Sequence, residues 1–186
     1  MVAYKFIMTA VEERREWVEE ITAQIPGCTV VWDEDRIPYN TFLRALATAG
    51  ESAVVMIQDD IILTSNFLEK IDAVIQSKPI FVIHFFSRRK DDIRIGSRWL
   101  PPNKCVDHQC IYYPPGYAAL MHAEQPPYEQ APEHQRTWHD LIPHDFLVRR
   151  NEKFWVHCPN LVDHRVGVSA IDPKRKNSRK SYTFEP

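Results

Sequence analysis

Two adjacent acidic residues at the end of an apolar run are the strongest chemical signal in this sequence. Asp59 and Asp60 follow Ala53–Ile57, which is typical of a strand buried on both faces of a sheet. Open parallel sheets bind ligands just beyond the carboxyl ends of their strands. Neighbouring carboxylates repel each other unless a cation neutralises them, and hard divalent cations often bridge carboxylates to phosphates. The pair therefore predicts a site for a metal-bound diphosphate, although a solvated turn or a helix-capping carboxylate would give the same pattern.

Two later segments carry further residues that suit chemistry. His164 follows an expected strand in a polar segment and could complete the ligand shell of the same metal, although a lone histidine is more often structural. Asp145 stands at the start of an expected helix and is interpreted as a general base, with His144 as an alternative base or acceptor-binding group. The other interpretation of Asp145 is an acid stabilised by the helix macrodipole.

A glycine and a cysteine pair give weaker signals. Gly116 precedes the small residues Ala118 and Ala119, and such a segment lets the backbone pass close to a ligand; a plain proline-glycine turn is the alternative. Cys105 and Cys110, with His108 between them, could form half of a zinc site or lie in a surface loop.

The elements that must position these residues follow one alternating pattern over the first half of the chain. Apolar runs and amphipathic segments predict the order β-α-β-α-β-α-β, and hence a single α/β domain with a mostly parallel central sheet flanked by helices. The expected strands are Tyr4–Met8, Cys28–Trp32, Ala53–Ile57 and Pro79–Phe86, and the expected helices are Val11–Ile25, Asn40–Ala49 and one that begins near Thr64 or Ser65. Beyond Ser87 we expect loops over 88–110 and 123–138, a helix at Ile142–Arg150 and a strand at Phe154–Val156.

The length, composition and net charge of the chain indicate what kind of protein it is. The 186 residues suit one domain over 1–171, followed by a basic tail over 172–186 that we expect to be mobile. A hydrophobic share of 44% supports a core, and no stretch is long enough for a membrane span. The N-terminus does not look like a signal peptide, so we expect a cytoplasmic protein with free thiols. A net charge of -2 argues against bulk capture of nucleic acid but leaves local basic patches open.

The order of these motifs resembles that of the GT-A glycosyltransferases, over about residues 4 to 170. The resemblance implies a nucleotide-sugar donor, Mn2+ or Mg2+ as cofactor, and an inverting transfer of the sugar to an acceptor hydroxyl. It assigns Asp60 and His164 to the metal, and Asp59 to the ribose or a water. Gln58 stands where the family usually has the first acid of its metal motif.

The resemblance also implies roles for residues on both sides of the metal motif. Thr9, Val11 and Arg14 follow the first strand and are expected to flank the nucleotide, although Arg14 on a solvated helix face is equally open. Asp33 and Arg44 correspond to an acid and an arginine that often precede the metal motif in family-2-like and lipopolysaccharide-type members. Gly116 corresponds to the glycine-containing loop, and His144 with Asp145 to the base motif, which carries an acid more often than a histidine at the first position.

The acceptor is left open by the sequence. Basic clusters at Arg88–Lys90 and Lys174–Lys180 could contact a polyanion, so a hydroxymethylated base in phage DNA fits, as do a glycan and a protein hydroxyl. Two other classes compete with a transferase. One is a metal-dependent phosphoesterase or nuclease, and the other is a catalytically inactive binding module of the same fold, for which Gln58 is a mild argument.

Overall fold

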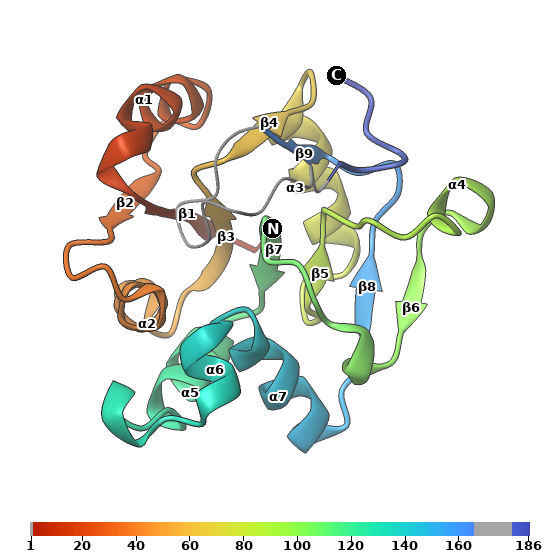
Figure 1. The fold of residues 1–186 in the computed structure, drawn as a ribbon. Helices are drawn as coiled ribbons and strands as arrows, with labels where there is room; N and C mark the ends of the chain where they lie inside the picture. The colour runs from red at the N-terminus through yellow and green to blue at the C-terminus, as the bar shows by residue number, and fades with distance from the viewer. Residues whose placement is uncertain (1, 166–179) are drawn as a thin grey trace.

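A computed structural model describes residues 2–165 and 180–186 of the chain (Figure 1). The strands are β1 Tyr4–Ala10, β2 Thr29–Trp32, β3 Ala53–Gln58, β4 Ile61–Leu63, β5 Ile83–His84, β6 Arg98–Leu100, β7 Cys110–Tyr113, β8 Phe154–Val156 and β9 Val162–His164. The helices are α1 Arg15–Gln24, α2 Pro38–Ala49, α3 Phe67–Ser77, α4 Asp92–Ile95, α5 Tyr117–Ala123, α6 Glu133–Thr137 and α7 Leu141–Arg150, and the short 3-10 turns are η1 Glu12–Arg14, η2 Pro102–Lys104 and η3 Tyr128–Gln130.

The central sheet has seven strands in the order β2-β1-β3-β7-β5-β8-β6. β1 pairs in parallel with β2 and β3, and β5 pairs in parallel with β8. The pairings β3–β7, β5–β7 and β6–β8 are antiparallel. The α/β class is therefore confirmed, and the expectation of a mostly parallel sheet is met in part. The sheet is mixed: β2, β1, β3, β5 and β8 run in one direction, and β7 and β6 run in the other.

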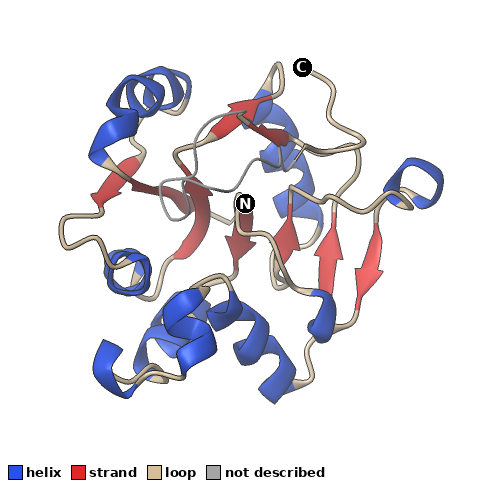
Figure 2. Cartoon of the chain, viewed as in Figure 1, coloured by secondary structure: helices blue, strands red, loops and turns tan. Residues whose placement is uncertain are grey.

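Helices cover both faces of the sheet, with α1 and α3 on one face and α2, α5, α6 and α7 on the other (Figures 1 and 2). Each face has its own apolar cluster, and β3 contributes to both. Val54 and Met56 of β3 pack under α2 and α7, whereas Val55 and Ile57 pack under α1 and α3. This burial on both faces is the reason why β3 is apolar at nearly every position.

A second, two-stranded sheet lies beside the carboxyl end of β3. It joins β4 to β9 in antiparallel fashion, with Ile61 opposite His164. Because β4 begins directly after Asp60, this ribbon brings a histidine from near the end of the chain to the acid pair.

The second half of the chain holds more structure than its composition predicts. The segment expected as a loop over 88–110 contains α4 and β6, and β7 begins at its last residue. The irregular excursion over 123–138 contains α6. The expected strand Pro79–Phe86 is reduced to Ile83–His84, whereas the predicted helix at Ile142–Arg150 and strand at Phe154–Val156 are confirmed within one residue.

The end of the chain is packed against the ribbon. The main-chain N–H of Ser181 donates to Asp163 at 2.7 Å, and Thr64 Oγ1 donates to the carbonyl of Glu185 at 2.6 Å. The expectation of a mobile tail is thus not met by its last residues, 180–186, while 166–179 lie outside the described residues. Among the described residues, no helix combines the length and apolar character that crossing a membrane requires.

Candidate functional site

The acid pair lies in the turn between β3 and β4, beyond the carboxyl ends of β1 and β3. Asp59 Oδ2 accepts the main-chain N–H of Val11 at 2.8 Å. Arg14 Nη1 donates to Asp59 Oδ1 at 2.6 Å and to Asp60 Oδ2 at 2.9 Å. The turn that follows β1 is therefore tied to the turn that follows β3, and one guanidinium is shared between both carboxylates.

His164 of β9 lies beside the acid pair, and Arg14, Asp59, Asp60 and His164 together form the acid cluster. The Nε2 atom of His164 lies 3.2 Å from Asp60 Oδ2, and the main-chain N–H of the next residue, Arg165, donates to the carbonyl of Asp60 at 2.7 Å. Asp60 Oδ1 and His164 Nδ1 are buried and have no hydrogen-bond partner among the described residues. A buried polar atom without a partner is costly, so these two atoms are candidates for contact with a ligand or a bound cation.

The two carboxyl groups differ in their electrostatic environment. Burial raises the pKa of Asp59 to about 6, although the charge of Arg14 acts in the opposite direction. Burial also disfavours ionisation of Asp60, but the hydrogen bond and charge of His164, together with Arg14, outweigh it and lower the pKa of Asp60. Both carboxyl groups are therefore mainly ionised at neutral pH, and Asp60 keeps its charge to a lower pH than Asp59 does.

Arg14 does not lie on a solvated helix face. Its side chain is 13% exposed, and its guanidinium lies 5.4 Å from the ring centroid of Trp17. The guanidinium of Arg165 lies 5.5 Å from the centroid of the same ring. Two arginines and a tryptophan thus flank the acid cluster, and the sequence singled out only Arg14.

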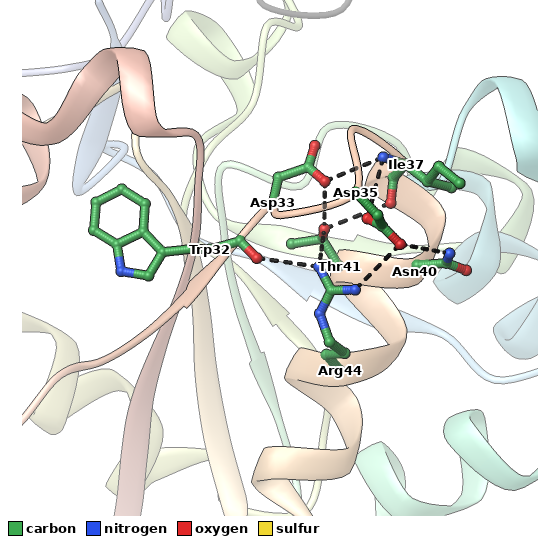
Figure 3. A network of polar contacts seen from close by, with 7 residues as sticks. All are labelled: Trp32, Asp33, Asp35, Ile37, Asn40, Thr41 and Arg44. Atoms are coloured by element: carbon green, nitrogen blue, oxygen red, sulfur yellow. Dashed lines mark hydrogen bonds and ion pairs between the residues drawn. The ribbon is translucent and has the colours of Figure 1, made fainter.

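Asp33 and Arg44 meet in a polar network at the carboxyl end of β2 (Figure 3). Asp33 Oδ1 accepts the hydroxyl of Thr41 at 2.8 Å and the main-chain N–H of Ile37 at 3.1 Å. Arg44 Nη2 donates to Thr41 Oγ1 at 2.8 Å and to the carbonyl of Trp32 at 3.1 Å. The network fixes the loop from β2 into α2, and no bond is drawn to the second oxygen of Asp33 in Figure 3.

Asp35 extends the same network. Its Oδ2 accepts Asn40 Nδ2 at 2.8 Å and lies 3.4 Å from Arg44 Nη1. Arg44 and Asn40 therefore contact Asp35, whereas Asp33, the acid that was grouped with Arg44 on sequence, is linked to Arg44 through Thr41. These contacts mainly shape the loop that leads from β2 into α2. The predicted contact of Asp33 and Arg44 with a nucleotide stays a prediction.

Thr9 and Gln58 lie side by side at the carboxyl edge, paired in register between β1 and β3. Both line a small pocket with Phe42, His108, Tyr113 and His139. Gln58 Oε1 accepts Gln109 Nε2 at 3.3 Å, so this side chain is held by the segment that leads into β7. The pocket lies next to the acid pair, because Gln58 directly precedes Asp59.

Asp145 lies at the centre of a second polar cluster, on the face of the sheet that carries α7. Its Oδ2 accepts Gln135 Nε2 and His134 Nε2, both at 2.7 Å, and its Oδ1 contacts His144 Nδ1 at 2.9 Å. Burial disfavours ionisation, but the hydrogen bonds from His134, His144 and Gln135 outweigh it and lower the pKa of Asp145. The carboxylate is thus charged and its two oxygens are already engaged.

The place of Asp145 in its helix differs from the expectation. It is the fifth residue of α7 Leu141–Arg150, and the first turn contains no acid. Asp145 therefore does not cap the helix, and the macrodipole explanation loses most of its force because that effect fades beyond the first turn.

The structure does not bring Gly116 to this edge of the sheet. Its N–H donates to the carbonyl of Glu51 at 3.0 Å, and Glu51 precedes the start of β3. β3 rises by about 3.3 Å per residue, which leaves Gly116 roughly 20 Å from the acid pair. Its left-handed φ of 80° opens helix α5, so the glycine has a local structural reason, and the expected contact with the donor is not supported.

The half zinc site that the sequence left open is not assembled. Cys105 and Cys110 belong to apolar clusters on opposite faces of the sheet. Burial raises the pKa of both thiols, and Cys105 Sγ lies 3.3 Å from Nε2 of His84 instead of His108. The surface-loop alternative is wrong as well, since both cysteines are fully buried.

Two residues of the first basic cluster, Arg88 and Arg89, contact other groups of the protein, although Arg88 and Lys90 are exposed. Arg88 forms an ion pair of 2.9 Å with the buried Asp107, and Arg89 donates to the carbonyl of Lys104. Most of the second cluster, from Lys174 to Arg179, lies outside the described residues. The contacts of Arg88 and Arg89 weaken the case for a polyanion at the first cluster, and contact of the second cluster with a polyanion stays a prediction.

Several contributors to these sites were not predicted. His134 and Gln135 reach Asp145 from α6, which was expected to be irregular. His108 was considered only as a zinc ligand, yet it lines the pocket beside Gln58. The only signal in the sequence that could have indicated these residues is the concentration of histidines between 108 and 144. Their positions in space follow from the packing of β7, α6 and α7.

The acid cluster can contribute to a divalent cation site but does not enclose one. No three His, Cys, Asp or Glu side chains are grouped for metal binding within residues 2–165 and 180–186. Asp60 Oδ1 and the imidazole of His164 nevertheless offer an oxygen and a nitrogen ligand with lone pairs that lack partners. Such a partial set suits Mn2+ or Mg2+ bound mainly by diphosphate oxygens and water.

Comparisons with known proteins supply no family or relative for the chain. No model of a protein family matches the sequence, and no curated protein is significantly similar to it.

Proposed function

We propose that this chain is a metal-dependent glycosyltransferase of the GT-A type, which moves a sugar from a nucleotide-sugar donor to an acceptor hydroxyl. The observation that carries the proposal is the cluster of Arg14, Asp59, Asp60 and His164 beyond the carboxyl ends of β1 and β3. Open α/β sheets bind ligands at this edge, and the cluster offers an ionised carboxylate and an imidazole with unpartnered lone pairs.

The donor is proposed to lie along the carboxyl edge of the sheet. Asp33 at the end of β2 is suited to the ribose, because an acid at the end of the second strand commonly binds ribose hydroxyls in nucleotide-binding α/β folds. The diphosphate would lie at Asp59 and Asp60, with Thr9, Val11 and Arg14 beside it. Arg14 contacts both acids and offsets part of their negative charge.

Asp60 and His164 would hold the metal. When bound, Mn2+ or Mg2+ supplies positive charge that stabilises the leaving nucleoside diphosphate. Asp59 keeps Val11 and Arg14 in place through its two oxygens, so its part is to fix the turn that faces the phosphates.

We propose that the pair of His144 and Asp145 removes the proton from the acceptor hydroxyl. The acceptor oxygen bonds to the anomeric carbon as the bond from that carbon to the diphosphate breaks, and the proton leaves to a base. Asp145 holds Nδ1 of His144 at 2.9 Å, which leaves Nε2 of the imidazole to take the proton. This geometry favours His144 as the acceptor of the proton, with Asp145 orienting it and stabilising its charge.

The acceptor is proposed to be a hydroxyl on a glycan, a protein or a hydroxymethylated base. The engaged state of Arg88 and Arg89 removes part of the argument for DNA. The choice among these acceptors therefore rests on experiment, with unmodified and hydroxymethylated duplexes compared in the same assay.

The test is a thermal-shift screen of nucleoside diphosphates and nucleotide sugars, with and without Mn2+, followed by assays of donor hydrolysis. We expect a metal-dependent rise in melting temperature and slow release of nucleoside diphosphate, both lost in Asp60→Ala. Full binding and hydrolysis in excess chelator would refute the metal site. Cleavage of DNA without any sugar donor would favour a nuclease, and binding without turnover would favour an inactive module.

A further inference from the structure

The edge of the central sheet that lies farthest from β2 carries several exposed aromatic and aliphatic side chains. β6 is the last strand of the seven-stranded sheet, next to β8 (Figure 1). Trp99 of β6 is 41% exposed, and Ile80 and Phe81, in the turn between α3 and β5, are 67% and 38% exposed. Single exposed apolar side chains are common on proteins, but several gathered at one place mark a surface that contacts something apolar.

Ring contacts join these side chains into one patch. The ring centroid of Trp99 lies 4.7 Å from that of Phe81 and 5.3 Å from that of Trp155, its partner in register on β8. Lys78 Nζ lies 4.3 Å from the ring centroid of Trp155. Trp155 packs against the apolar cluster on the face that carries α3, whereas Trp99, one strand further out, is exposed. We call Lys78, Ile80, Phe81, Trp99 and Trp155 the aromatic patch.

Two lysines give the aromatic patch a positive charge. Lys78 lies over Trp155, and the exposed Lys153 directly precedes β8. The parallel register that pairs Ile83 with Trp155 places Lys153 beside Phe81. Neither lysine forms an ion pair with an acid within the described residues. The patch therefore complements a surface that is both negatively charged and apolar.

The geometry of the patch distinguishes among the possible partners. Stacking on a sugar requires a flat, exposed ring face, but the rings of Trp99 stand at 75° to Phe81 and at 71° to Trp155. Pairing with a second copy through the sheet edge would rely on β6, which has only three residues, and very short edge strands discourage such pairing.

A lipid bilayer requires neither a flat ring face nor a long edge strand. Tryptophan, phenylalanine and isoleucine side chains bind in the region between the headgroups and the acyl chains. Lysines beside them are attracted by anionic headgroups. The aromatic patch and Lys153 provide both kinds of side chain at one place on the surface.

We infer that the aromatic patch docks on the surface of a bilayer that contains anionic phospholipids. Ile80, Phe81 and Trp99 enter the interface, and Lys78 and Lys153 contact the headgroups. The inference goes beyond the proposed function and does not rest on it. β5 runs in the same direction as β3, so Phe81, which precedes β5, lies at the opposite edge of the sheet from the acid cluster.

The test is cosedimentation of the full chain with phosphatidylcholine vesicles, prepared with and without phosphatidylglycerol. The variants are Ile80→Glu and Lys153→Gln. Their matched controls are Leu120→Glu, on α5 across the sheet and 45% exposed, and Lys5→Gln, on an exposed lysine of β1. Each control makes the same change of charge as its partner variant. All four side chains are exposed, so the melting temperature of each variant should stay near that of the parent.

We expect the parent to bind the vesicles that contain phosphatidylglycerol, and to bind them less tightly as salt is added. Ile80→Glu should lower the affinity at least about tenfold, because an inserted isoleucine is replaced by a charge that the lipid repels. Lys153→Gln should lower it about fivefold. Leu120→Glu and Lys5→Gln should bind as the parent does. Lipids brominated in the acyl chain should quench the tryptophan fluorescence of the parent more than that of Trp99→Phe.

Three results would overturn the inference. One is that the parent binds neither kind of vesicle, or binds both equally well. Another is that Ile80→Glu binds as tightly as Leu120→Glu, or that Trp99→Phe is quenched as strongly as the parent. The third is a dimer, detected by light scattering, that Ile80→Glu dissociates while no vesicle is bound, which would assign the aromatic patch to contact between two copies of the chain.

Discussion

His157 gives the sharpest stability prediction in this structure. It follows β8, its main-chain N–H donates to the carbonyl of His84 at 2.9 Å, and its ring packs near Phe85. Burial, with a smaller effect from the charge of Lys78, lowers the pKa of His157 to about 4. In the unfolded chain the imidazole has its ordinary pKa of about 6.5. The folded state therefore binds fewer protons than the unfolded state between these two values.

The sign and size of the effect follow from linkage. Stability from His157 is fully present above about pH 6.5 and is lost as the pH falls through the window from 6.5 to 4. At pH 5 the unfolded imidazole is almost fully protonated and the folded one is almost neutral. The free energy of unfolding should therefore fall by roughly 2 kcal/mol between pH 7 and pH 5 from this residue alone. His84 and His108, whose pKa values burial also lowers, add to the loss in the same direction.

The assay is urea unfolding at pH 7, 6 and 5 for the parent and for His157→Gln, which cannot take up a proton. The stability difference between the two should shift by roughly 2 kcal/mol in favour of the variant when the pH falls from 7 to 5. His122→Gln, which changes an exposed histidine of α5, serves as the control and should follow the parent at each pH. Parallel pH profiles for the parent and His157→Gln would refute the burial argument.

Three further predictions concern the two polar clusters and the thiols. Asp145→Asn should lower turnover at least about 100-fold with donor binding nearly unchanged. His144→Gln should have the same effect if His144 takes the proton. Near-normal turnover in both variants would mean that the cluster is structural. Asp60→Asn should abolish the Mn2+-dependent thermal shift while the circular dichroism spectrum is kept, and an unchanged shift would exclude Asp60 as a ligand. Cys105 and Cys110 should react with a thiol reagent only after unfolding, because burial raises the pKa of both thiols; fast labelling of either in the folded protein would contradict their burial.

The local elements of the first half could be predicted because their signals are local. β3 is apolar at nearly every position since both of its faces are covered, and α1 and α2 show the periodicity of helices that bury one side. The place of Asp59 and Asp60 at the carboxyl end of β3 follows from the same pattern. Each of these features depends on residues that are close to one another in the sequence.

The second half resisted prediction because its short elements are stabilised by distant partners. β7 has four residues and lies between β3 and β5, which come from a different part of the chain, so its antiparallel direction was not encoded in its own pattern. α6 has five residues and was hidden among prolines. Elements of this length form only when tertiary packing supports them.

The α/β class and the acid pair at the end of a buried strand could be predicted from the sequence, and Asp33 and Arg44, which the family resemblance grouped, belong to one network at the end of β2. Which of the other candidates lie near the acid pair depends on the tertiary structure. The β4–β9 ribbon brings His164 to Asp60 across about a hundred residues, α6 supplies two partners to Asp145, and the start of β3 holds Gly116 at the opposite edge. These outcomes depend on strand order and direction, which arise from pairing between distant segments and cannot be deduced from the spacing of residues along the chain.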